Sequence, residues 1–395
     1  MRRWLLPEHI EDVLPAEARA MERLRRSILD LFEVHGYELV APPLLEYVES
    51  LLSGTGRDLD LATFKLVDQL SGRMMGVRAD HTPQVARIDA HLLNRQGVAR
   101  LCYCGSVLHT VPAGMTKMRE PIQIGAELYG HAGIEADIEI VRLMIDALKA
   151  AGIATIHLDL GNPTIYRALA NHRPSPKGEG EFAEDLFHAV QRKDAPAAKE
   201  LGGEAFAALT ALNGESGKVI AQARKRLPKS KPIASALDQL ETLAARCAAP
   251  GVDVSIDLAE LGGFNYESGL VFAAFTPGSP DAIARGGRYD EVGASFGRAR
   301  PATGFTMDLR QLVAVAKNGA PRRAILAPAG DEPALAKAIA ALRAKGEVVV
   351  VEMPGHEKAR KELGCDRQLT KRSGKWTVAS LSPALSQGRG SKRGS

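Results

Sequence analysis

The sequence RLCYCGSVLHTVPAGMTKMREPIQIGAELYG, from Arg100 to Gly130, is the most informative stretch of the chain. Its two runs LCYCGSVLH and PIQIGAELYG have the composition of neighbouring β-strands. Cys102 and Cys104 lie two residues apart in the first run and therefore share one face of the strand. We interpret them as packed thiols, because no metal-ligating partner stands at ligand spacing near them. Glu127 lies in the second run, where a buried carboxylate is costly unless it has a partner.

The bulk properties are those of a cytoplasmic globular protein. The chain has 395 residues, of which 45% are hydrophobic and 25% charged, and this length corresponds to two or three domains. Its formal net charge of +4 is too small to indicate nucleic-acid binding by itself. No apolar run reaches the roughly 18 residues that a membrane helix needs. The N-terminal apolar run breaks at Pro7 and Glu8, which argues against a secretory signal. Four scattered cysteines are typical of a reducing cytoplasm, so we expect a cytoplasmic protein without a membrane partner, a metal or a cofactor.

The remaining sequence alternates helical and strand-like segments. Apolar residues at helical spacing predict helices over residues 16–35, 82–95, 135–151 and 332–345. Pro42 and Pro43 interrupt a strand-like run, as in an edge or interface strand. The runs TFKLVDQ and RMMGVRAD predict a hairpin that turns at Ser71-Gly72. Short antiparallel strands flanked by segregated helices favour the α+β class over a doubly wound sheet.

We expect four regions along the chain. Residues 1–316 form a core domain, and residues 163–250 within it, which are rich in Ala, Lys and Glu, form a helical insert. Residues 317–381 form a small C-terminal α/β domain. Residues 382–395 end in SQGRGSKRGS, which lacks apolar side chains, and we expect them to be disordered.

Six short motifs occur in order along the core domain. They are DVLP at residues 12–15, HGYELVAPPLLE at 35–46, VRADHTPQVAR at 77–87, QIGAELYG at 123–130, RGGRYD at 285–290 and GFTMDL at 304–309. Together they make the chain, as far as about Val315, resemble histidyl-tRNA synthetase. The resemblance implies a class II aminoacyl-tRNA synthetase-like antiparallel sheet core with flanking helices. It also implies a homodimer, because the proline-containing first signature builds the dimer interface of that class.

Three departures from the synthetase pattern remove its catalytic cations. The resemblance places an Arg and a Glu where this chain has His109 and Val111, and further arginines where it has Gly262 and Gln311. Asp308 also puts a carboxylate near the expected phosphates. An Arg at such a position would hold phosphate oxygens through charge-assisted hydrogen bonds. Each lost cation should cost about 2–4 kcal/mol of transition-state stabilisation, or roughly 10²–10³ in rate. We therefore expect no synthetase activity and no catalytic residue.

The pattern resembles the synthetase-like regulatory subunits of ATP phosphoribosyltransferase, which keep VRADxTPQVAR and RGGRYD but lack the ATP-binding arginines. The resemblance implies a subunit that is not catalytic alone. It implies assembly with a short-form catalytic transferase, around a homodimer core within a hetero-octamer. That complex catalyses the first step of L-histidine biosynthesis and is inhibited by histidine. The alternative is a histidyl-tRNA synthetase paralogue that senses histidine or binds tRNA. We do not expect tRNA as a partner, because the tail over residues 322–381 is short for an anticodon module.

Four polar residues match those that hold histidine in the synthetase. The resemblance implies that Asp80, Thr82, Gln123 and Glu127 contact the amino group and the imidazole of the ligand. A carboxylate suits an ammonium group, and a second carboxylate suits a ring N–H. In the alternative interpretation, Asp80 and Glu127 are structural struts that pair with nearby arginines, namely Arg78, Arg87 or Arg119.

Tyr266, Arg285 and Tyr289 are further candidates for histidine contact. In the alternative interpretation they belong to the scaffold, since the glycines that follow Arg285 allow close backbone approach. Gly262 and Glu267 differ from the residues that relatives carry at these positions. The resemblance therefore implies only a modest affinity for histidine.

Overall fold

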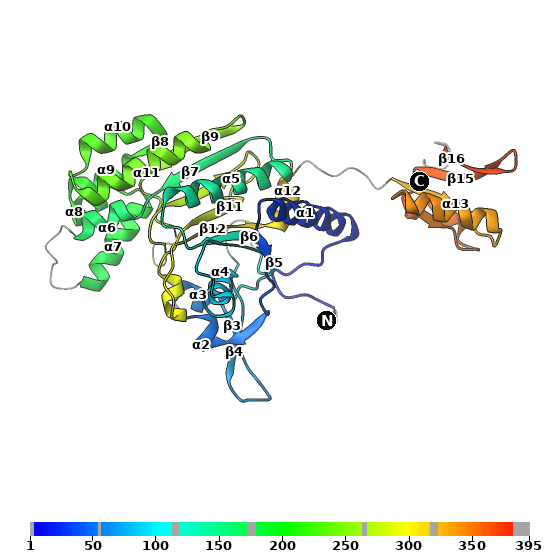
Figure 1. The fold of residues 1–395 in the computed structure, drawn as a ribbon, viewed down its shortest axis with the longest axis horizontal. Helices are drawn as coiled ribbons and strands as arrows, with labels where there is room; N and C mark the ends of the chain where they lie inside the picture. The colour runs from blue at the N-terminus through cyan, green and yellow to red at the C-terminus, as the bar shows by residue number, and fades with distance from the viewer. Residues whose placement is uncertain are drawn as a thin grey trace, which may run out of the picture. The chain divides into compact units, whose positions relative to one another are not determined.

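The computed structural model describes residues 4–53, 57–112, 118–171, 179–262, 267–316 and 323–381 (Figure 1). The chain divides into two compact units, Met1–Asn318 and Gly319–Ser395. No described helix is long and apolar enough to span a membrane. The tail expected to be disordered, residues 382–395, lies outside the described residues.

A nine-stranded sheet forms the centre of the first unit. Its strands, in spatial order, are β1 (Glu38–Leu39), β5 (Ala99–Ser106), β6 (Ile122–Tyr129), β12 (Ala302–Asp308), β11 (Ala284–Arg288), β10 (Val271–Phe275), β7 (Ile156–Gly161), β9 (Val252–Asp257) and β8 (Asn213–Glu215). The six strands from β5 to β7 are antiparallel as expected, but β1 pairs with β5, and β7 with β9, in parallel. The sheet is therefore mixed rather than purely antiparallel. The parallel β7–β9 pair is possible because the long helical segment between them supplies the crossover that such a pair requires.

Helices cover one face of this sheet. They are α1 (Pro15–Val34), α5 (Ile134–Ala150), α11 (Lys231–Cys247) and α12 (Leu309–Val315), as Figure 1 shows. The helices predicted over residues 16–35 and 135–151 correspond to α1 and α5, because both carry an apolar stripe at helical spacing. On α1 the stripe includes Ile28 and Phe32, which are fully buried, and Phe32 meets Phe305 of β12 edge-on. Burial of each such side chain contributes about 1.5–3 kcal/mol. The other face of the sheet carries a second apolar cluster, in which Leu101 of β5 is buried with Val85 and Phe296, beside the polar side chains of the site.

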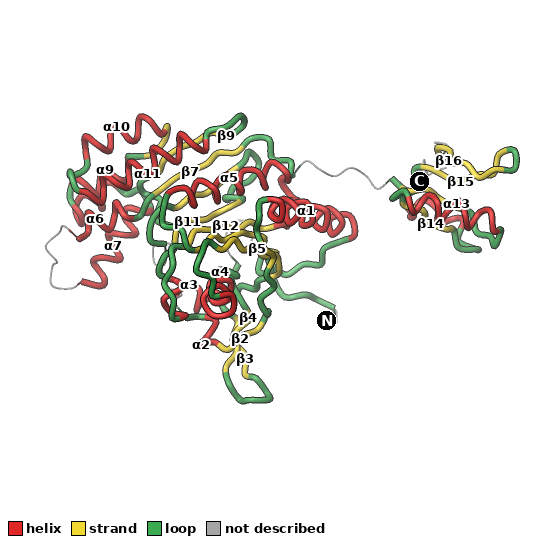
Figure 2. The backbone as a smooth tube through the Cα atoms, viewed as in Figure 1, coloured by secondary structure: helices red, strands yellow, loops and turns green. Residues whose placement is uncertain are grey.

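The segment between β7 and β9 contains six helices among its described residues. Figure 2 shows this segment as almost wholly helical. The helices are α6 (Thr164–Asn171), α7 (Glu179–Gln191), α8 (Ala195–Gly202), α9 (Glu204–Ala211), α10 (Ser216–Arg226) and α11. Tyr166 of α6 anchors this group through edge-on ring contacts with Phe187 and Phe206. The three-residue strand β8 was not expected from the composition of the segment. It adds to the sheet edge by pairing with β9.

A small three-stranded sheet lies between β1 and α4 (Thr82–Arg87) in the sequence. Its strands, in spatial order, are β2 (Leu45–Tyr47), β4 (Met74–Val77) and β3 (Phe64–Val67). The predicted β3–β4 hairpin is present, with Gly72 at φ +72° in its turn. Helices α2 (Val48–Leu51) and α3 (Arg57–Ala62) connect β2 to β3. The helix predicted over residues 82–95 differs from the expectation. It begins as α4 (Thr82–Arg87) and continues as a π-helical segment, η1 (Ile88–Leu93), that ends at the left-handed Asn94.

The second unit is a four-stranded sheet in the order β14-β13-β15-β16. Its elements are β13 (Ala324–Ala327), α13 (Pro333–Ala344), β14 (Val348–Val351), the 3₁₀ segment η3 (Glu357–Leu363), β15 (Arg367–Arg372) and β16 (Lys375–Ser380). The helix predicted over residues 332–345 is α13. Strand β15 was not predicted, because its sequence RQLTKR is polar. It is positioned by a tight turn at Ser373-Gly374, where both residues have positive φ.

Candidate functional site

Glycines form the floor of the site on the face of the sheet opposite α1 and α5, where α4 packs over β5. Gly304 of β12 lies opposite Glu127 of β6 on one side and opposite Gly287 of β11 on the other. A side chain at Gly304 would collide with the carboxylate of Glu127. A Cβ at Gly287 would lie 2.7 Å from the carboxylate of Glu267. The absence of side chains at these two positions therefore allows both carboxyl groups to lie directly over the backbone of the sheet.

Glu127 is a buried carboxyl group held by hydroxyls. It is 1% exposed, and it accepts hydrogen bonds from Thr82 Oγ1 at 3.1 Å, from the Tyr103 hydroxyl at 3.3 Å and from the Tyr289 hydroxyl. The Tyr289 hydroxyl also lies 3.4 Å from that of Tyr129. Burial raises the pKa of Glu127 to about 8, although these hydroxyls oppose the shift. Neutral donors rather than cations stabilise this group.

The arginines proposed as struts are engaged elsewhere. Arg78 donates to the carbonyls of Ser106 and Pro42, both at 2.8 Å. Arg87 pairs with Glu46, and Arg119 donates to the carbonyl of His109 at 3.1 Å. None of the three bonds Asp80 or Glu127 among the described residues, so the expected pairing with these arginines is not present there.

Asp80 and Gln123 lie beside Glu127, where the segment between β4 and α4 passes over the sheet. The Asp80 carboxylate accepts from the backbone N–H of Thr82 at 3.3 Å, and burial raises its pKa. Gln123 Oε1 lies 3.2 Å from the backbone nitrogen of His81 and 2.9 Å from its Nδ1. The His81 ring stacks on that of Tyr103, with centroids 4.7 Å apart. Burial lowers the pKa of His81 to about 4, so the ring is neutral near pH 7.

Arg285 stands between two hollows on the same face of the sheet. It is exposed and lies opposite Thr306 of β12 and Ala273 of β10. One hollow, of about 170 Å³, reaches from Arg285 to Gln123 and Asp308. The other, of about 200 Å³, contains acidic side chains and is lined by Arg285, Glu260, Gly262 and Glu267. Within the described parts of the chain, no hydrogen bond or ion pair occupies the Arg285 guanidinium.

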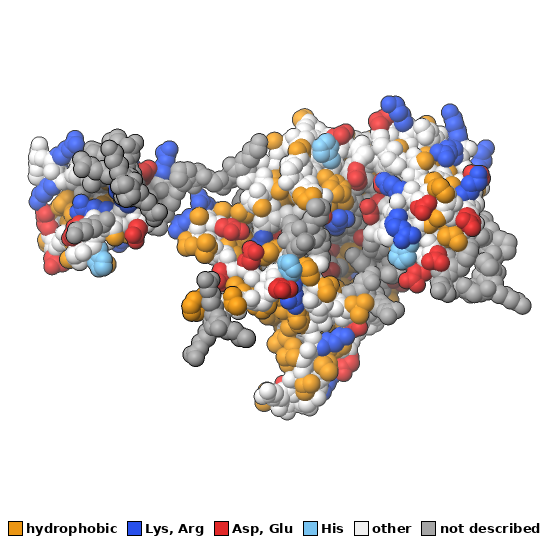
Figure 3. Space-filling model, turned by 180° about the vertical axis from the view of Figure 1, so that it is seen from behind, with side chains coloured by type: hydrophobic (Ala, Val, Ile, Leu, Met, Phe, Trp, Pro, Cys, Tyr) orange, Lys and Arg blue, Asp and Glu red, His pale blue; other side chains and the backbone are white. Residues whose placement is uncertain are grey.

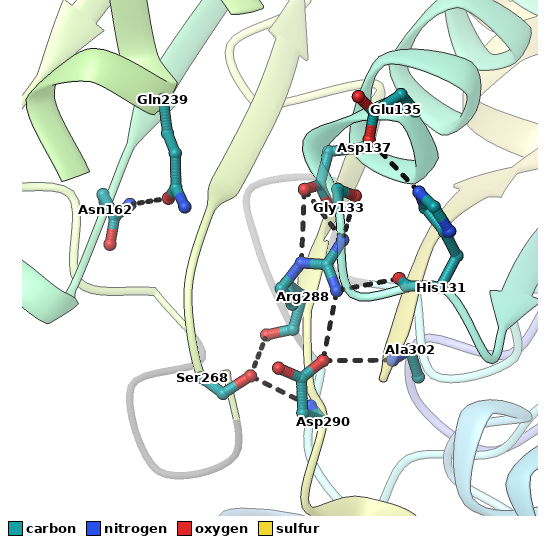
Figure 4. A network of polar contacts seen from close by, with 10 residues as sticks. All are labelled: His131, Gly133, Glu135, Asp137, Asn162, Gln239, Ser268, Arg288, Asp290 and Ala302. Carbon is teal, nitrogen blue, oxygen red and sulfur yellow. Dashed lines mark hydrogen bonds and ion pairs between the residues drawn. The ribbon is translucent and has the colours of Figure 1, made fainter. Parts of the chain in front are cut away.

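Arg288 and Asp290, by contrast, are structural members of the RGGRYD motif (Figure 4). Arg288 is 8% exposed, and its guanidinium bonds Asp137 in the first turn of α5 at 2.9 Å. It also donates to the carbonyls of His131 and Gly133. Asp290 accepts from Arg288 and from a backbone N–H of β12. These two residues clamp β11 to α5 and β12, which leaves Tyr289 between them to face Glu127.

At the positions that would hold the nucleotide in a synthetase, the side chains of this chain make other contacts. His109 Nε2 lies 2.9 Å from the carbonyl of Ala79, and Val111 is 64% exposed. The backbone N–H of Gly262 donates to Glu260, and the Gln311 amide donates to Ser279 Oγ and to a neighbouring carbonyl. The Asp308 carboxylate caps α12 by accepting from the backbone N–H of Arg310 at 3.0 Å. This arrangement provides no group that could hold a triphosphate at these positions.

The structure brings most of the predicted site residues together. Asp80, Thr82, Gln123, Glu127 and Tyr289 form one connected group, and Arg285 stands apart on the same face. Tyr266 lies outside the described residues.

Sequence reasoning missed Tyr103, which donates to Glu127 from the neighbouring strand. The contact depends on the strand register, which pairs Tyr103 with Gly125. It could not be predicted from local sequence, because Tyr103 and Glu127 are 24 residues apart.

Family models match both units. The model described as histidyl-tRNA synthetase matches residues 9–312, and the model described as the ATP phosphoribosyltransferase subunit HisZ C-terminal domain matches residues 322–379. A protein of Ralstonia pickettii called ATP phosphoribosyltransferase regulatory subunit is 56% identical over 382 residues, covering 95% of this chain and 97% of the relative. A Methylobacillus flagellatus protein of the same name is 54% identical, covering 96% and 98%.

Solved structures show the same fold. A Bacillus halodurans protein titled ATP phosphoribosyltransferase regulatory subunit/histidyl-tRNA synthetase superposes with a TM-score of 0.77 at 27% identity, covering 91% of this chain and 96% of that one. Histidyl-tRNA synthetase from Nostoc superposes with a TM-score of 0.76 over 96% of this chain and 97% of that one. At 18% identity, this second likeness concerns the fold alone.

Proposed function

The chain belongs to the family of ATP phosphoribosyltransferase regulatory subunits, and we propose on this premise that L-histidine is its effector and binds over the glycine floor of the sheet. The protein is a regulatory subunit in histidine biosynthesis and is not catalytic alone. Loss of the cationic positions agrees with this role. His109, Gly262 and Gln311 make neutral contacts where phosphoryl chemistry depends on fixed charges.

The observation that carries the histidine proposal is the distribution of charge over the floor. Asp80 and Glu127 lie at one end, and Arg285, unpaired within the described residues, lies on the same face. A zwitterionic amino acid with a polar ring matches this arrangement. Asp80 receives the ammonium group, Glu127 the ring, and Arg285 the carboxylate. Thr82 and Tyr289 orient Glu127, and Gln123 fixes the backbone of the segment above the ligand through His81.

A second proposal concerns assembly. Exposed apolar side chains lie along the segments that carry the prolines of the first signature, with Leu39 at 58%, Leu44 at 48% and Leu45 at 40% exposure. Figure 3 shows hydrophobic side chains gathered on the part of the surface from which the β3–β4 hairpin projects. Such patches mark protein interfaces. We assign this surface to a homodimer core, to which short-form catalytic subunits add in a cytoplasmic hetero-octamer.

The experiment measures histidine inhibition of phosphoribosyl-ATP synthesis by the mixture of this chain and the short-form transferase. We expect inhibition of the mixture with the wild-type chain. Glu127→Ala should desensitise the mixture to histidine while gel filtration still shows one hetero-oligomeric peak. Unchanged inhibition with this variant, with its fold verified by a melting curve, would place the effector elsewhere.

A further inference from the structure

The helical segment between β7 and β9 contains a hollow that takes no part in the site over the sheet. This hollow, of about 480 Å³, opens where α10 ends and α11 begins, and we call it the insert hollow. It is lined by the buried side chains of Ala223, Leu227, Ile233 and Leu237, and by the exposed Ala234. Its volume is more than twice that of either hollow over the sheet. A concave apolar surface of this size is typical of a binding site.

The rim of the insert hollow is strongly basic. Residues 224–231 read RKRLPKSK and carry five cations and no acid, whereas the whole chain has a net charge of only +4. Arg224 is neutralised by Asp238 and Glu241 of α11, at 2.9 and 2.6 Å. The other four cations form no ion pair among the described residues, and they are Lys225, Arg226, Lys229 and Lys231. Figure 3 shows Lys and Arg side chains gathered over this end of the first unit. The insert hollow therefore combines an apolar floor with a rim of positive charge.

The insert hollow lies at the opposite edge of the nine-stranded sheet from the surface assigned to the homodimer. Strand β1, which contains Leu39, forms one edge, and β8, which leads directly into α10, forms the other. In Figure 1, β8 and α10 lie together at the end of the sheet that is farther from β5. Neighbouring strands are about 4.8 Å apart, so roughly 38 Å of sheet separates the two edges. A homodimer through Leu39, Leu44 and Leu45 therefore leaves the insert hollow free for a different subunit.

We propose, as a refinement that rests on the proposed function, that the short-form catalytic subunit binds in the insert hollow through an acidic amphipathic segment. Apolar side chains of that segment pack on the floor, and its carboxylates meet Lys229 and Lys231 at the rim. The apolar floor favours a protein over a nucleic acid, because a phosphate backbone pairs with lysines but brings no apolar side chain to bury. The basic rim disfavours a second copy, because a two-fold contact would bring two identical rims together.

The test measures the dissociation constant of the full chain for the short-form transferase by isothermal titration calorimetry. Reversal of both rim charges in Lys229→Glu/Lys231→Glu should weaken binding at least about tenfold in about 0.1 M salt. In about 1 M salt the loss should shrink to within about threefold, because the Debye length falls from about 10 Å to about 3 Å. Both lysines are exposed and form no ion pair among the described residues, so the melting temperature should not change.

A second variant separates the apolar floor from the charge. Ala234→Arg places a long side chain in the insert hollow and at the same time adds a cation. Binding on the floor predicts association at least about tenfold weaker at both salt concentrations, because the new side chain occupies the space. Attraction by charge alone predicts tighter association. Arg is a good helix former and Ala234 is exposed, so this variant should also keep its melting temperature.

The matched control is Arg19→Glu/Arg23→Glu, which reverses two exposed charges on α1 and should leave the affinity within about threefold of the wild-type value. Unchanged affinity in both insert variants, with the wild-type chain still bound, rejects the assigned surface and leaves the proposed function standing. An equal loss in the α1 control, or tighter binding by Ala234→Arg, shows that only charge matters and also overturns the inference.

Two further measurements address the other occupants. Gel filtration of Lys229→Glu/Lys231→Glu alone should match the wild-type chain, and a changed elution volume would assign the insert hollow to a second copy. A fluorescent RNA duplex should show no saturable binding to the wild-type chain. RNA binding that this variant loses, with transferase binding intact, would make a nucleic acid the occupant. Failure of the wild-type chain to bind the transferase rejects the proposed assembly and this inference together.

Discussion

At the residue scale, Glu127 should leave a signature in the pH dependence of stability. Its folded pKa of about 8 lies above the ordinary value of 4.5, so the folded state holds an extra proton between these values. Within that window the free energy of unfolding falls by about 1.4 kcal/mol per pH unit as the pH rises. We expect the loss between pH 6 and pH 8 to be about 2 kcal/mol smaller in Glu127→Gln. Urea unfolding of both proteins at the two pH values measures this difference. Equal losses would show that Glu127 is ionised in the folded protein.

His81 does not obscure that comparison. Its folded pKa of about 4 lies below the ordinary value of 6.5. Its contribution to the free energy of unfolding therefore rises with pH between these two values and is complete near pH 7. The contribution is present in both proteins and cancels in their difference.

Arg285 is the residue whose replacement should affect binding without affecting the fold. Its guanidinium is exposed and forms no hydrogen bond or ion pair with the described residues, so Arg285→Gln should leave the melting temperature unchanged. Loss of its charge-assisted bond to the histidine carboxylate should lower the affinity by roughly 10–100-fold. Calorimetric titration with histidine measures the change, and Arg323→Gln, at an exposed position in the second unit, is the matched control. An unaltered affinity would remove Arg285 from the site.

At the scale of elements, the helices were predictable where a long apolar stripe runs along the sequence. α1 and α5 are examples, because their buried faces repeat at helical spacing. The π-helical turn η1 was not predictable. It contains Asp89, which pairs with the buried Arg300, more than two hundred residues away in the sequence. Tyr103 escaped prediction as a partner of Glu127 for the same reason, because it lies on a different strand. Local sequence predicts an element, whereas a site depends on the register between elements.

The clamp between β11 and α5 should be far more important for stability than for binding. Arg288→Gln leaves Asp137 buried without its cation, which should cost about 3–5 kcal/mol of unfolding free energy. The half-exposed pair Arg100–Glu139 joins β5 to the same helix, and Arg100→Gln should cost at most about 1 kcal/mol. Urea unfolding of the two variants compares them directly. Similar losses would show that Arg288 does not act as a clamp.

At the scale of the whole molecule, the chain combines a synthetase-like fold with neutral side chains at the positions of the synthetase's catalytic cations. The resemblance in sequence revealed both the fold and the missing cations, because motifs that lie in order along a chain are visible without a structure. It could not show that the acidic hollow contains a free carboxylate oxygen, since that depends on burial and on the packing of Glu267 over Gly287. Regulation by histidine requires only that the ligand prefer the inhibited state of the complex. A modest affinity for the isolated subunit is therefore compatible with effective control.

The most direct test of the account is the rate of phosphoribosyl-ATP synthesis by the short-form transferase, measured with and without this chain. We predict no activity for this chain alone, a higher rate for the mixture than for the transferase alone, and a single hetero-oligomeric peak in gel filtration. Two separate peaks at micromolar concentration, with an unchanged transferase rate, would contradict the account.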